Sequence, residues 1–139
     1  MKKSMKRFHA AFAIVIILSL PACMSEENIK LDDPLNSGRG FIESALKADY
    51  VKADKYLLQD STNQQYLLGL IDFNKNSNKE ERENYRNANI IVDSLVPLSD
   101  SVNILYYKNS YKKEPSKLKI VKHNNDWLID FKYSFTEEE

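Results

Sequence analysis

The chain of 139 residues contains one cysteine, Cys23, and the position of this residue suggests a specific chemistry. A cysteine reacts through its thiolate, which is a strong nucleophile, so an accessible thiol can be alkylated. A single cysteine also excludes an internal disulfide and a cysteine-rich zinc module. The alternatives for Cys23 are a buried thiol with no chemical role, or an unused cysteine after an ordinary signal peptide.

The segment before Cys23 has the organisation of a targeting signal. Residues 1–7 are basic, residues 10–20 are almost entirely apolar, and Pro21 and Ala22 follow. Eleven helical residues span only about 16 Å, whereas the hydrocarbon core of a bilayer is about 30 Å thick. A positive stretch, a short apolar core and a small residue are typical of a signal peptide. We therefore predict that residues 1–22 are removed.

The four residues 20–23, Leu-Pro-Ala-Cys, resemble the bacterial lipobox. This resemblance implies that the Cys23 sulfur receives a diacylglycerol group, that cleavage precedes Cys23, and that its amine is acylated. Two or three acyl chains anchor a protein durably. Met24, by resemblance to Gram-negative lipoproteins, implies the outer membrane. Glu26 and Glu27 resemble the acidic clusters that accompany export to the cell surface in some Gram-negative lineages, and both the periplasmic face and the cell surface stay open. The sequence thus predicts a small bacterial lipoprotein whose partner is the membrane.

Few other residues have the setting that catalysis or metal binding requires. His123 is the only histidine after residue 22 and lies beside the turn-forming Asn124, so we expect it to be exposed. Asp72 and Asp130 are candidates for a buried carboxylate with a raised pKa, although surface positions explain both more simply. No glycine-rich phosphate loop or serine-nucleophile elbow is found. We predict no catalytic residue, no metal site and no cofactor.

Three aromatic residues are candidates for lining a ligand pocket: Tyr66, Tyr106 and Trp127. The alternative is that these side chains fill the core, since each large aromatic residue buries about 150–250 Å². A domain of about one hundred residues has little apolar material to spare, which favours the core interpretation.

Lysines and tyrosines concentrate in the segment 106–122, which could contact anionic lipid or an acidic glycan. The lysines are Lys108, Lys112, Lys113, Lys117, Lys119 and Lys122. The alternative, which we favour, is that they solubilise the sheet and prevent its edge from pairing with other chains.

Charge argues against nucleic acid as a partner. Four of the 20 basic residues and none of the 20 acidic residues fall within residues 1–22, so a chain beginning at Cys23 has an excess of four acids. Nucleic-acid binding needs a concentrated basic face.

Hydrophobic spacing predicts a tether and then helices. Residues 23–36 are polar and contain Pro34, so we expect a flexible, lipidated tether. Residues 37–88 show helical spacing: a helix capped by Ser37 or Asn36, a short helix over 50–58, a third that starts at 60–62, a loop over 74–78, and a fourth after a capping box at 77–80.

From residue 89 the hydrophobic period changes to two. Alternation predicts strands over 90–96, 102–107, 117–121 and 127–135, separated by turn residues at 97–100, 112–115 and 124–126. Short turns imply an antiparallel meander. Helices followed by strands predict an α+β fold, with an acidic tail at 136–139.

This order of parts resembles the nuclear transport factor 2-like (NTF2-like) superfamily, in particular small lipoproteins related to lumazine-binding proteins. Residues 41–56 are similar to the opening helices of that family, and residues 116–130 to its closing hairpin with a Trp-x-Ile-Asp pattern. The resemblance covers residues 37–135 and implies a cone of N-terminal helices packed on a curved four-stranded antiparallel sheet. Together with the predicted anchor and the lack of a converging set of catalytic residues, the resemblance favours a non-enzymatic module that binds an envelope protein or a small apolar or glycan ligand. The alternative is a small hydrolase or isomerase that uses the cone as its active site.

Overall fold

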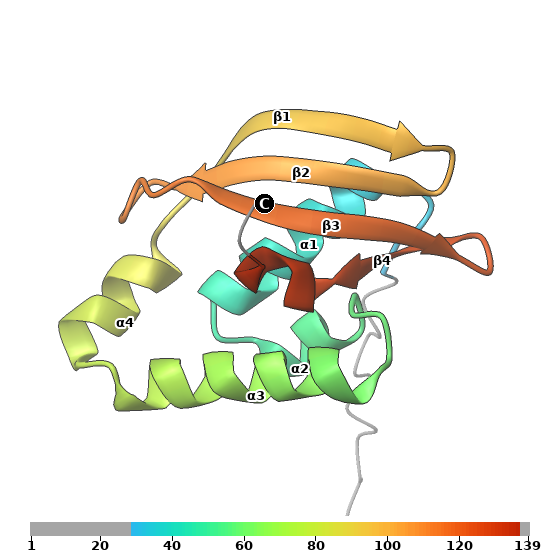
Figure 1. Ribbon diagram of the computed structural model, residues 1–139. Coiled ribbons are helices and arrows are strands. Elements are labelled where there is room, and N and C mark those ends of the chain that lie inside the picture. The colour runs from blue at the N-terminus through green and yellow to red at the C-terminus, as the bar shows by residue number, and fades with distance from the viewer. Residues whose placement is uncertain (1–28, 137–139) are drawn as a thin grey trace, which may run out of the picture.

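A computed structural model describes residues 29–136, and these form an α+β fold (Figure 1). Four helices come first: α1 (Pro34–Leu46), α2 (Tyr50–Asp54), α3 (Ser61–Asn76) and α4 (Lys79–Arg86). Four strands follow, β1 (Ile90–Ser99), β2 (Val102–Asn109), β3 (Ser116–His123) and β4 (Asp126–Asp130), and then a short 3₁₀ helix, η1 (Phe131–Phe135). The predicted α+β class is confirmed. The signal peptide 1–22, Cys23 and residues 137–139 lie outside the described residues.

Helix α1 begins earlier than its sequence pattern predicts. Asp33 is the N-cap, since its carboxylate accepts a hydrogen bond of 2.8 Å from the backbone N–H of Asn36, and Pro34 occupies the first turn. The prediction of a cap at Ser37 or Asn36 is therefore wrong. Proline is well suited to a first helical turn because the N–H that it lacks has no partner there.

The predicted tether is also too long. Ile29, Leu31 and Leu35 are partly buried against the core, and the carbonyl of Leu31 accepts a 2.8 Å hydrogen bond from the backbone N–H of Trp127. Within the described residues, the segment 29–36 is therefore part of the folded domain. The rest of the tether, 23–28, lies outside them.

The other helices start at short polar caps. Asp49 caps α2 and Asp60 caps α3, as the start signal at 60–62 predicts. Asn78 caps α4, whereas the capping box predicts Ser77, one residue earlier. Helix α2 ends at Asp54 rather than at 58, and α3 continues to Asn76 through much of the predicted loop.

The strands form one antiparallel sheet in the order β1-β2-β3-β4. In the register of the sheet, Leu105 pairs with Leu118 and Asn103 pairs with Ile120, which in turn pairs with Ile129. These residues share the face that the helices cover. Strand β1 continues to Ser99 through Pro97, where the sequence predicts a turn; proline is tolerated because β1 is an edge strand and its register is irregular there.

The last predicted strand, 127–135, is wrong in its second half. Strand β4 ends at Asp130, and residues 131–135 turn into η1. This turn brings Phe131 into the core, where its ring centre lies 4.9 Å from that of Phe41. Burial of a large aromatic ring in an edge-to-face pair therefore replaces continued strand pairing.

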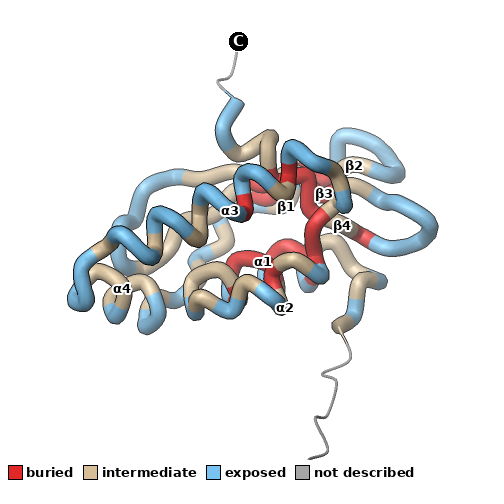
Figure 2. Tube along the Cα trace, turned by 90° about the horizontal axis from the view of Figure 1, so that it is seen from below, coloured by how far each residue is buried: buried red, intermediate tan, exposed pale blue. Residues whose placement is uncertain are grey.

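Helix α1 packs tightly against the sheet. A β-carbon at Gly38 would lie 2.7 Å from Leu105 Cδ2 and 2.9 Å from Ile120 Cδ1, so the absence of a side chain permits this approach. Buried residues concentrate along α1 and in the sheet, whereas α3 and α4 are mostly exposed (Figure 2). Among the described residues, none of the helices has the length and apolar character needed to cross a membrane.

Candidate functional site

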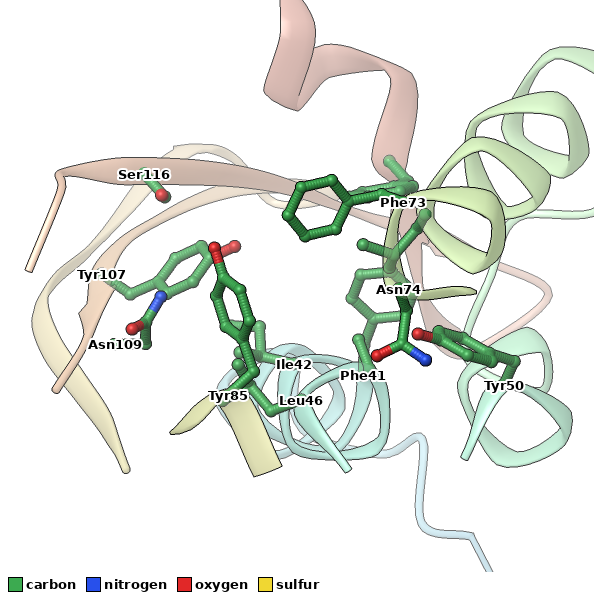
Figure 3. Close-up of a pocket in the computed structure, with 13 residues that line it drawn as sticks. Phe41, Ile42, Leu46, Tyr50, Phe73, Asn74, Tyr85, Tyr107, Asn109 and Ser116 are labelled. Atoms are coloured by element: carbon green, nitrogen blue, oxygen red, sulfur yellow. The ribbon is translucent and has the colours of Figure 1, made fainter. Parts of the chain in front are cut away.

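A pocket of about 170 Å³, here called the inner pocket, opens between α1, α3, α4 and the helix-covered face of the sheet (Figure 3). Helices α3 and α4 pack less closely on the sheet than α1 does. Helix α4 has no buried residue, and α3 buries only Asn63 and Leu67. The pocket is lined by Phe41, Ile42, Ala45, Leu46, Tyr50, Leu70, Phe73, Asn74, Tyr85, Tyr107, Asn109, Ser116 and Phe131.

The walls of the inner pocket are mainly apolar. Phe41 and Ile42 of α1 form part of the buried core, and Phe131 of η1 packs against Phe41. On the opposite side, Phe73 of α3 is 49% exposed, and its ring centre lies 5.9 Å from that of Tyr85 in α4. One wall is therefore fixed by the core, and the other consists of two exposed helices joined through an aromatic pair.

Three of the six polar side chains on the lining are tyrosines, and the others are Asn74, Asn109 and Ser116. Burial raises the pKa of Tyr50, Tyr85 and Tyr107 above 10, the ordinary value for tyrosine. The effect is largest for Tyr107, whose pKa rises to about 12 even though its hydroxyl is hydrogen-bonded to Ser116. A buried phenolate would lose its hydration, so these side chains stay neutral.

The inner pocket has no side chain on its lining that is charged near neutral pH. Among its lining residues there is no carboxylate, histidine, cysteine, lysine or arginine. The structure places no group of three or more potential metal-ligating side chains together within residues 29–136. The tyrosine hydroxyls are therefore the only ionisable groups in the lining, and their raised pKa values keep them protonated near neutral pH.

A second, larger pocket of about 560 Å³, here called the outer pocket, adjoins the inner pocket. The two share Leu70, Tyr85, Tyr107, Asn109, Ser116 and Phe131. The outer pocket also has charged residues on its lining, namely Lys112, Glu114 and Lys117. The lining therefore changes from partly charged in the outer pocket to uncharged in the inner pocket.

Lys112, on the lining of the outer pocket, forms an ion pair with a residue of α4. Its ammonium lies 3.3 Å from a carboxylate oxygen of Glu81 and 4.9 Å from the centre of the Tyr111 ring. The hydrogen bond with Glu81 is the main cause of the raised pKa of Lys112. This ion pair, together with the aromatic contacts of Tyr85, connects α4 to the β2–β3 loop.

Asp130 is buried, with 7% of its surface exposed, so the prediction of a surface position is wrong. The carboxylate lies 3.6 Å from the ammonium of Lys119 and 2.5 Å from that of Lys132, and it accepts a hydrogen bond from Asn63. The hydrogen bond with Asp130 is the main cause of the raised pKa of Lys132. This cluster does not line either pocket, and it joins α3 to the end of β4.

The three aromatic candidates do not converge. Tyr66 packs on Phe135, with parallel rings 4.5 Å apart, and does not line the inner or the outer pocket. Trp127 is 9% exposed in the core, with the ammonium of Lys122 5.7 Å from its ring. Tyr106 lines the outer pocket but not the inner pocket.

The remaining candidates are peripheral. His123 and Asp72 are exposed, as expected. Several lysines of the 106–122 segment are engaged within the domain: Lys108 pairs with Asp93 at 3.0 Å, Lys112 with Glu81 and Lys119 with Asp130. These contacts argue against a single free anion-binding surface. The prediction that the lysines protect a sheet edge is wrong, because they lie on the inner strands β2 and β3 and on the loop between them.

Sequence reasoning missed Tyr50, Tyr85 and Tyr107 as pocket residues. The available signal was the alternation of β2, which sets Leu105 and Tyr107 on one face and Ile104 and Tyr106 on the other. Both sets are apolar, so the pattern does not show which of them the helices cover. Comparisons of the chain with protein-family models, curated proteins and solved structures find no match.

Proposed function

We propose that this protein is a lipid-anchored lipoprotein of the bacterial envelope whose folded domain binds a small apolar ligand in the inner pocket and catalyses no reaction. The observation that carries the proposal is the inner pocket itself: about 170 Å³ of space walled by core aromatics on one side and by exposed helices on the other. Ligand pockets are typically apolar with a few polar groups that orient the ligand, which matches this lining.

The architecture supports an NTF2-like cone as the finer description of the fold. Helix α1 crosses one face of the antiparallel sheet, and a parallel bridge between Leu57 and Ile129 attaches the segment after α2 to β4. In a cone of this kind the ligand occupies the space between helices and sheet, which is where the inner pocket lies.

The proposed anchor rests on the sequence of residues 1–23, which lies outside the described residues. Acylation of Cys23 and a location in the outer membrane, on its periplasmic face or at the cell surface, are parts of the same proposal. Replacement Cys23→Ser should abolish incorporation of labelled palmitate and leave an uncleaved precursor. Normal processing of that variant would contradict the anchor.

Ligand binding is tested with toluene and benzene, two neutral apolar single-ring probes. The mature protein in lipid nanodiscs should show a higher unfolding temperature with either probe, because a ligand that binds only the folded state stabilises it by mass action. The signal is followed by circular dichroism, with ligand-observed NMR as a second measurement.

The matched control is Ala45→Leu in identical nanodiscs, which corrects for partition of the probes into lipid. Leucine at position 45 fills part of the inner pocket, so the variant should keep its fold and lose the response. Ala45→Val, which adds less volume, serves if leucine prevents folding. Equal responses of wild type and variant would contradict binding in the inner pocket.

A further inference from the structure

The two pockets differ in the charge of the side chains that line them. In the inner pocket the ionisable lining side chains are tyrosines, and burial raises the pKa of all three, Tyr50, Tyr85 and Tyr107. The charged lining residues, Lys112, Glu114 and Lys117, belong to the outer pocket. An ion that entered the inner pocket would lose hydration without gaining a countercharge, which is costly.

The polar groups of the inner pocket suit one neutral hydrogen-bonding group. Figure 3 shows the hydroxyls of Tyr85 and Tyr107 pointing into the pocket from α4 and β2, with Ser116 on the neighbouring strand. A hydroxyl both donates and accepts hydrogen bonds. A ligand hydroxyl, carbonyl or amide at this end would therefore be satisfied, while the ligand's apolar body contacts Phe41, Ile42 and other apolar lining residues.

The volume limits the size of that body. The inner pocket holds about 170 Å³, close to the ~150 Å³ of an engineered apolar cavity that binds benzene. This corresponds to one six-membered ring with a small substituent.

We infer that the inner pocket selects an uncharged single-ring compound that bears one hydrogen-bonding group, and that it discriminates against ions of the same size. This inference rests on the proposed function, because it specifies the ligand of the same site. Its support is the arrangement of apolar walls, neutral hydroxyls and external charges around a space of that size.

The test compares ring compounds of similar size and different charge: phenol and benzyl alcohol as neutral probes, benzoate as anion and benzylammonium as cation. Binding is measured by ligand-observed NMR on the mature protein in nanodiscs, as the difference between wild type and Ala45→Leu. We expect the neutral probes to bind and the two ions to bind at least about tenfold more weakly.

A second arm uses 4-nitrophenol, which ionises near neutral pH. Its affinity should fall as the ligand loses its proton, since the lining tyrosines do not titrate in that range. The phenol of Tyr107 is tested by Tyr107→Phe, which should weaken phenol binding about three- to tenfold and leave toluene unchanged. Tyr106→Phe, an adjacent residue outside the inner pocket, is the control.

The outcomes distinguish the inferred charge selection from the proposed binding of a ligand. Benzoate or benzylammonium binding as tightly as phenol would overturn the charge selection while leaving ligand binding in place. Failure of every probe, toluene and benzene included, would overturn both. An affinity for 4-nitrophenol that does not change with ionisation of the ligand would also count against the inference.

Discussion

Asn63 in α3 and Asp130 at the end of β4 are 67 positions apart in the sequence, and the Asn63 Nδ2 donates a hydrogen bond of 3.3 Å to the Asp130 carboxylate. The same amide nitrogen donates to the Asp60 carboxylate at 2.8 Å, and the Asn63 Oδ1 accepts from the backbone N–H of Lys132 at 2.9 Å. Asn63 is fully buried. One side chain therefore joins the start of α3 to the turn between β4 and η1.

Replacement Asn63→Ala should lower the free energy of unfolding by about 2–3 kcal/mol. The reason is that the Lys132 N–H loses its side-chain acceptor and the buried carboxylate of Asp130 loses a donor. Urea denaturation followed by circular dichroism measures the loss. Asn76→Ala, at the exposed end of the same helix, should change stability by less than about 0.5 kcal/mol; equal effects of the two variants would contradict the role of Asn63.

Two helical glycines should respond in opposite directions to alanine. A β-carbon at Gly40 would lie 2.4 Å from the hydroxyl oxygen of Tyr56, whose ring is buried, whereas a β-carbon at Gly69 meets nothing within 4 Å. Gly40→Ala should therefore destabilise the protein by about 1–2 kcal/mol net. Gly69→Ala should stabilise it by about 0.5–1 kcal/mol through helix propensity. Thermal unfolding of both variants measures the contrast, and stabilisation by Gly40→Ala would show that the Tyr56 ring moves freely.

The free energy of unfolding should fall at acid pH, in part because the Asp60 carboxylate becomes protonated. The backbone N–H of Asn63 and the ammonium of Lys132 lower the pKa of Asp60 below its ordinary value of 3.8. A carboxylate with a lowered pKa in the folded state stabilises the fold above the unfolded pKa, and this contribution is lost as pH falls through the folded value. The difference in unfolding free energy between wild type and Asp60→Asn should thus be present at pH 6 and shrink below about pH 4. Asp72→Asn, at an exposed position in α3, is the matched control for removal of one carboxylate.

At alkaline pH, deprotonation of Tyr107 should lower the free energy of unfolding. Its pKa of about 12 in the folded state exceeds the ordinary value of 10, so between these values the folded protein holds a proton that the unfolded chain releases. Stability should therefore fall as pH rises from about 10 toward 12. Ultraviolet absorbance of phenolate should show a component that titrates near pH 12, is missing in Tyr107→Phe and is retained in Tyr106→Phe. A Tyr107 that ionises together with exposed tyrosines would contradict its burial.

Local patterns predicted the α+β order because they depend on neighbours a few residues away. The Asp60 start signal marks the beginning of α3, and the period-two alternation after residue 89 marks the sheet. Boundaries were predicted less well where a distant contact decides them. Strand β4 ends at Asp130 because Phe131 packs against Phe41, 90 positions earlier. The start of α1, by contrast, is set by a local signal, the Asp33 cap followed by Pro34 in the first turn.

The sequence by itself determined the order of helices and strands, and it carries the lipobox-like motif at Cys23, since side-chain periodicity and short motifs are local properties of the chain. Only the tertiary structure decided that the helices cover Leu105 and Tyr107 rather than Ile104 and Tyr106, and that Asp130 is buried. The physical reason is that burial depends on which surfaces dock, and both faces of β2 are apolar enough to be covered. The inner pocket is a product of that docking, because its lining comes from α1, α3, α4, the sheet and η1 together.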